Sequence, residues 1–142
     1  MFQSILKDDG YFSAIDPMKR ILVAENTYDL GEYLIALHQS GELNTEFGEV
    51  SGRMVYYPPC HLREQNIGRS YEELLNLLPG VNLEPVDSSL YCCGMGGIVG
   101  FKREYHDTSI HLGDRLMNNI NDLKPDRLVT DCLSCRLQFN QL

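Results

Sequence analysis

The spacing of apolar positions along the chain predicts helices and short strands in alternation. Asp16–Pro17 is typical of a helix start, and apolar residues then recur at helical spacing as far as Leu37. This pattern predicts a helix over residues 17–38, with a break near Asn26 or Gly31. The first part of the chain is therefore expected to be helical.

Three short runs of β-favouring residues follow, and segments with helical spacing separate them. The predicted strands cover residues 54–57, 81–86 and 127–130. The predicted helices cover residues 70–78, residues 98–121 and a segment that starts near Ser134. Strands that alternate with helices form parallel sheets with crossover helices. The predicted fold class is therefore α/β.

A polar segment divides the chain. Residues 41–52 contain three glycines and three glutamates and have the composition of a surface connection. We therefore expect a helical lead-in over residues 1–45 and a second domain over residues 46–142.

Composition and charge exclude several classes of function. The 142 residues carry 20 acidic against 12 basic side chains, a net charge of -8, which disfavours nucleic acid as a partner. No apolar run approaches the roughly 18 residues that a membrane span needs. The N-terminus lacks the basic start and apolar stretch of a secretory signal, so a cytoplasmic location is expected. The odd count of five cysteines argues against a disulfide framework.

The cysteines follow the predicted strands. Cys60 follows the first strand, Cys92 and Cys93 follow the second, and Cys132 and Cys135 follow the third. Because the carboxyl ends of parallel strands share one edge of a sheet, we expect all five thiols to meet there. An adjacent cysteine pair suits a polynuclear iron-sulfur cluster better than one zinc ion. Zinc binding and five unrelated buried thiols remain as alternatives.

Three phrases around these cysteines resemble a known family. They are YPPCHLR at 57–63, CCGMGG at 92–97 and DCLSC at 131–135. Together they are similar to the cysteine-rich CCG domain of the heterodisulfide reductase B subunit and of the iron-sulfur C subunit of anaerobic glycerol-3-phosphate dehydrogenase. The resemblance implies that all five cysteines ligate a 4Fe-4S cluster, which is noncubane in some members. Relatives have two such repeats, and this chain resembles the C-terminal one.

The resemblance also implies a function in a multi-subunit oxidoreductase. The domain is expected to relay electrons from a flavin-containing dehydrogenase subunit to other iron-sulfur domains or a quinone, without catalytic residues of its own. Such partners would place it in the cytoplasm or peripherally on the inner face of the membrane. Three alternatives stay open: disulfide reduction at the cluster, a structural zinc-binding interaction module, and a thiol-disulfide switch. An expressed chain that has lost its cluster is expected to hold zinc or an empty site.

Glycines follow the adjacent cysteine pair. Gly94, Gly96 and Gly97 are expected to allow positive φ angles or a close backbone approach around a cofactor. A plain flexible turn before a helix is the alternative.

Overall fold

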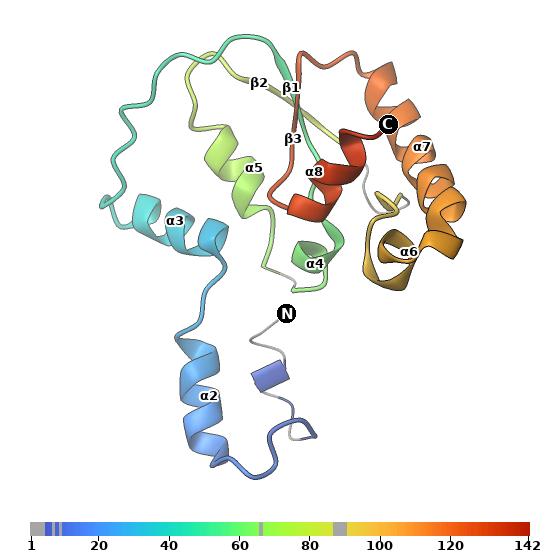
Figure 1. The fold of residues 1–142 in the computed structure, drawn as a ribbon. Coiled ribbons are helices and arrows are strands. Elements are labelled where there is room, and N and C mark those ends of the chain that lie inside the picture. Colours follow the sequence, from blue (N-terminus) through green and yellow to red (C-terminus); the bar gives the residue numbers. More distant parts are fainter. Residues whose placement is uncertain (1–4, 7, 9, 66, 87–90) are drawn as a thin grey trace. The chain divides into compact units, whose positions relative to one another are not determined.

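The structure is a computed structural model of residues 1–142, and it describes all of them except 1–4, 7, 9, 66 and 87–90. The chain forms two compact units. The first unit consists of residues 1–46 and 61–74, and the second consists of residues 47–60 and 75–142. Each unit has its own helices, and the second contains the sheet (Figure 1).

Two helices of the first unit replace the single helix expected over residues 17–38. They are α2 (Pro17–Glu25) and α3 (Leu30–Gln39). The break falls after Asn26, one of the two predicted positions, where the backbone leaves helical geometry with φ -106° and ψ 14°. Asp29 then starts α3 through a capping box with Glu32, because each side chain accepts a backbone N–H that the helix start leaves unpaired.

A close contact joins two helical segments of the first unit. A methyl group on Gly31 of α3 would lie 2.7 Å from a ring carbon of Tyr71, so this glycine lets the ring approach the helix backbone. Tyr71 belongs to α5 (Ser70–Leu75), which is shorter than the helix predicted over residues 70–78. A one-turn helix, α4 (Cys60–Arg63), precedes it.

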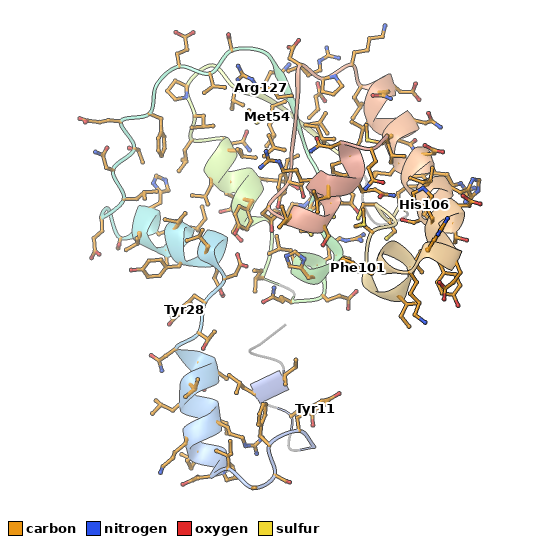
Figure 2. All side chains as sticks on the ribbon, in the orientation of Figure 1. Tyr11, Tyr28, Met54, Phe101, His106 and Arg127 are labelled. Atoms are coloured by element: carbon orange, nitrogen blue, oxygen red, sulfur yellow. The ribbon has the colours of Figure 1, made fainter. Side chains whose placement is uncertain are left out.

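The second unit contains a parallel three-stranded sheet. Its strands are β1 (Arg53–Tyr56), β2 (Asn82–Pro85) and β3 (Arg127–Val129), in the order β2-β1-β3. Met54 of β1 is the register partner of Arg127 of β3, and Figure 2 labels both. The predicted α/β class with a parallel sheet is confirmed.

Four helical segments follow the sheet's first two strands in the described part of the second unit. They are α6 (Gly97–Phe101), the 3-10 helix η1 (Arg103–Tyr105), α7 (His106–Asp122) and α8 (Leu133–Phe139). The prediction of one helix over residues 98–121 is therefore wrong. The backbone extends at Lys102, with φ -106° and ψ 131°, and Phe101 and His106 mark the two sides of this interruption in Figure 2. In the described part of the chain, every helix is too short or too polar to span a membrane.

A buried core cluster of the second unit packs against the sheet. Val55 of β1 and Tyr57, the residue after this strand, are buried together with Leu116 and Ile120 of α7. Cys135 of α8 belongs to the same buried cluster. Burying each large apolar side chain contributes about 1.5–3 kcal/mol. This core therefore holds α7 and α8, and with them one buried cysteine, against the sheet.

Ile120→Val is expected to lower the free energy of unfolding by about 0.5–1.5 kcal/mol, because Ile120 is only 1% exposed and the lost methylene leaves a small cavity. Urea unfolding of the metal-free chain measures the effect. Asn118→Ala, on the exposed side of the same helix, is the control and should change stability by less than about 0.5 kcal/mol. Equal stability of the two variants would contradict this packing.

Candidate functional site

The five cysteines lie in the second unit. Cys60 follows β1 and is the first residue of α4, and Cys132 follows β3 and precedes α8 as its N-cap. Between β2 and Cys92, residues 87–90 lie outside the described part of the chain. Exposure separates the five thiols: Cys60 and Cys92 are exposed, Cys132 is half-buried, and Cys93 and Cys135 are buried.

A direct sulfur contact joins the second and third cysteine groups. The Cys135 Sγ donates to the Cys93 Sγ over 3.1 Å, and Cys92 also hydrogen-bonds to the Cys93 side chain. Two thiolates on one tetrahedral zinc ion with Zn–S bonds of about 2.3 Å lie about 3.8 Å apart. The Cys93 and Cys135 sulfur atoms are closer than that, at a distance typical of a hydrogen bond between them. Cys93 is therefore the centre of a three-thiol contact.

The environment of Cys93 favours its protonated form. The hydrogen bond with Cys135 and the burial of the thiol raise the pKa of Cys93 from 9.0 to about 11. Hydrogen bonds from Cys92 and from the Met95 backbone N–H act in the opposite direction. Metal binding requires a thiolate, so a metal at this position must displace the proton and part the two sulfur atoms.

The structure brings together three of the five predicted ligands, namely Cys92, Cys93 and Cys135. In the part of the chain that is described, no set of three or more His, Cys, Asp or Glu side chains is arranged to hold a metal ion. The expected convergence of all five thiols is therefore not confirmed. The donor set nevertheless fits a thiophilic group, because five thiols without a disulfide among them suit zinc or an iron-sulfur cluster.

Three glycines, Gly94, Gly96 and Gly97, follow Cys92 and Cys93 in the cysteine loop (residues 92–97), and they differ in their surroundings. Gly94 has φ 85°, and a methyl group on it would overlap the main-chain oxygen of Ser109 in α7. Its N–H donates to the Cys92 Sγ over 3.3 Å. Gly97 has φ 58° and Gly96 has φ -77°, and a methyl group on either would meet no described heavy atom within 4 Å. Their role in cofactor binding stays a prediction.

Two buried polar residues behind this loop were missed from the sequence. The Ser109 Oγ donates to the Gly94 carbonyl oxygen over 2.9 Å, and the Gln138 Nε2 donates to the Ser109 main-chain oxygen over 2.9 Å. Isolated Ser and Gln residues in helices are typical of exposed faces. A signal existed, because Ser109 shares the buried face of α7 with Gly113 and Leu116.

The five thiols are expected to react with iodoacetamide at different rates in the reduced, metal-free chain. The thiolate is the nucleophile, and raising a pKa from 9.0 to about 11 lowers the thiolate fraction near neutral pH about a hundredfold. Cys60 and Cys92 should be labelled first, and Cys93 at least about ten times more slowly. Raising the pH from 9 towards 11 should increase Cys93 labelling.

Peptide mass spectrometry after timed labelling measures this order. Denaturing urea is the control, because unfolding should bring all five rates close together. Labelling of folded Cys93 as fast as Cys60 would show that the buried sulfur contact does not persist in solution.

Comparison with known proteins gives relatives whose names denote oxidoreductases or lactate utilization. The chain is 38% identical over 87 residues to the C subunit of the anaerobic glycerol-3-phosphate dehydrogenase of Escherichia coli K12, covering 61% of this chain and 22% of that protein. It is 33% identical over 91 residues to the B subunit of the fumarate reductase (CoM/CoB) of Methanothermobacter marburgensis, covering 63% and 18%. Lactate utilization protein A of Anoxybacillus flavithermus is 26% identical over 133 residues, covering 92% and 52%.

The chain thus spans about a fifth of the length of the first two relatives. No solved structure matches it. The model of the CCG family, described as a cysteine-rich domain, matches residues 54–140, a range that includes all five cysteines and the whole sheet apart from Arg53. The chain therefore belongs to the CCG cysteine-rich domain family.

Proposed function

We propose that the chain is an iron-sulfur electron-transfer domain of a multi-subunit oxidoreductase. Its five cysteines would hold one 4Fe-4S cluster, which when bound accepts and releases single electrons. The observation that carries the proposal is the contact between Cys93 and Cys135, which joins two distant parts of the family motif through their sulfur atoms. The relatives named as dehydrogenase and reductase subunits support it.

The exposure of the thiols suits electron relay. Cys93 and Cys135 belong to the buried core of the second unit, whereas Cys60 and Cys92 are exposed. A group held between them would have one buried side, where contact with water and oxidants is limited. Its other side would be exposed, so that a partner protein could approach it. Solvent exposure and burial are two of the factors that set a cluster potential.

The loop backbone supplies donors to sulfur. The Gly94 N–H donates to the Cys92 Sγ, and the Met95 N–H donates to the Cys93 Sγ. Such bonds stabilise negative charge on thiolate sulfur, because the donors are fixed and need no reorganisation. In this proposal the electrons come from a flavin-containing dehydrogenase subunit of the anaerobic glycerol-3-phosphate type, and other iron-sulfur domains or a quinone accept them.

Metal and acid-labile sulfide analysis of the chain purified without oxygen tests the proposal. The expected result is about four irons and four sulfides per chain, with an EPR signal in one of the two redox states. A glycerol-3-phosphate dehydrogenase flavin subunit mixed with the loaded chain should then reduce the cluster when its substrate is added. Zinc without sulfide in protein that never met oxygen would overturn the proposal in favour of a structural module.

A further inference from the structure

A buried amide lies behind the cysteine loop. The Gln138 side chain of α8 is 0% exposed, and its Nε2 donates to the Ser109 main-chain oxygen over 2.9 Å and to the Ser109 Oγ over 3.3 Å. A main-chain oxygen can only accept, so the orientation of the amide is fixed with Nε2 towards Ser109. The Gln138 Oε1 has no hydrogen-bond partner among the described residues. An unpaired buried acceptor is costly, so an apolar side chain would suit this position better if packing alone mattered.

The hydrogen bonds continue from this amide to a thiol. The Ser109 Oγ donates to the Gly94 carbonyl oxygen over 2.9 Å. That carbonyl and the Met95 N–H belong to one peptide group, and the Met95 N–H donates to the Cys93 Sγ. A line of hydrogen bonds therefore runs from Gln138 through Ser109 and the peptide group between Gly94 and Met95 to Cys93. Hydrogen bonds in such a line polarise one another, and each donor strengthens the next.

Two glycines allow the backbone segments along this line of hydrogen bonds to lie close together. A methyl group on Gly113 of α7 would lie 3.0 Å from the Gln138 Nε2 and 2.9 Å from the Cys93 carbonyl oxygen. A methyl group on Gly94 would overlap the Ser109 main-chain oxygen and lie 3.2 Å from the Gln138 Nε2. The cysteine loop thus lies directly on the backbone of α7, and small rotations of its peptide groups are restricted.

We propose that Ser109 and Gln138 are positioning residues that aim the Met95 N–H at the Cys93 sulfur and thereby raise the reduction potential of the bound cluster. The inference rests on the proposed function, because it concerns the cluster held by Cys93. Reduction adds negative charge to the cluster and its thiolates. A donor aimed at a thiolate sulfur stabilises the reduced state more than the oxidised state, so the potential rises.

The test compares the midpoint potentials of loaded Ser109→Ala and Gln138→Leu variants with that of the unchanged chain, by EPR-monitored redox titration. The comparison is made at the midpoint potential of the unchanged chain, where half of its cluster is reduced. At that potential, the ratio of reduced to oxidised cluster should be about three- to tenfold lower in each variant than in the unchanged chain. A tenfold change in this ratio corresponds to about 59 mV for one electron. Ser109→Thr keeps the hydroxyl, so its midpoint potential should stay close to that of the unchanged chain. Thr108→Ala, at the exposed neighbouring position, is the matched control and should leave the potential unchanged.

A purely structural role gives a different result. The two variants would then lose stability in the metal-free state while their potentials stayed equal to that of Thr108→Ala, and the proposal would be overturned. Using both variants guards against one that fails to fold.

Iron and sulfide in the unchanged chain test the proposed function separately. If the chain takes up no cluster, cobalt(II) serves as the probe, because its thiolate charge-transfer band reports the donor strength of sulfur. A band shifted in Ser109→Ala relative to Thr108→Ala would support the aiming of the N–H, and an unshifted band would refute it.

Discussion

Replacing Cys93 with serine is expected to reduce the iron and sulfide content of anaerobically purified chain at least about tenfold, because thiolate sulfur and not a hydroxyl is the ligand that iron-sulfur clusters use. Cys93 is the central thiol of the three in contact, since both Cys135 and Cys92 hydrogen-bond to it. Its loss therefore affects both the second and the third cysteine group. Iron and sulfide assays per folded chain measure the effect.

The control for this variant is Ser134→Ala, which changes a residue in the first turn of α8, between Cys132 and Cys135, without removing a thiol. It should keep full iron content. Circular dichroism of both metal-free variants separates loss of ligand from loss of fold, because serine is close to cysteine in size. Unchanged iron content in folded Cys93→Ser would remove Cys93 from the ligand set.

The strands and the order of the cysteines could be predicted because they depend on local patterns. Short β-favouring runs mark all three strands, and the prolines that follow Tyr57 end the first of them. The interruption at Lys102 could not be predicted in the same way. The apolar spacing continues through it, and that spacing gives no sign of the close approach of Gly100 in α6 to the Met95 carbonyl oxygen, which a methyl group on Gly100 would overlap.

The five cysteines of the candidate site could be named from the sequence, and their role as ligands stays a prediction, whereas the contacts among them could not be predicted. The spacing identified Cys93 and Cys135, but they are 42 residues apart, and their sulfur contact depends on how α8 packs in the core. The same packing buries Gln138, whose residue type predicts an exposed position. Tertiary packing of helices, which periodicity does not specify, therefore decides which side chains surround the thiols.

Gly94→Ala is expected to lower the free energy of unfolding of the reduced, metal-free chain by about 2–5 kcal/mol. Its φ of 85° lies in the left-handed region, which costs a residue with a Cβ about 1–2 kcal/mol. The added methyl would also overlap the Ser109 main-chain oxygen, and forcing an extra methyl into a packed site costs about 1–3 kcal/mol more. Urea unfolding followed by circular dichroism measures the change.

The neighbouring glycines are matched controls that separate the two contributions. Gly97 has φ 58° but open space around it, so Gly97→Ala should cost only the conformational part, about 1–2 kcal/mol. Gly96 is extended and open, so Gly96→Ala should change stability by less than about 0.5 kcal/mol. If Gly94→Ala is no less stable than Gly97→Ala, the loop does not lie on α7 as described. The expected order instead means that the glycine after the cysteine pair holds Cys92 and Cys93 in place by its contact with α7.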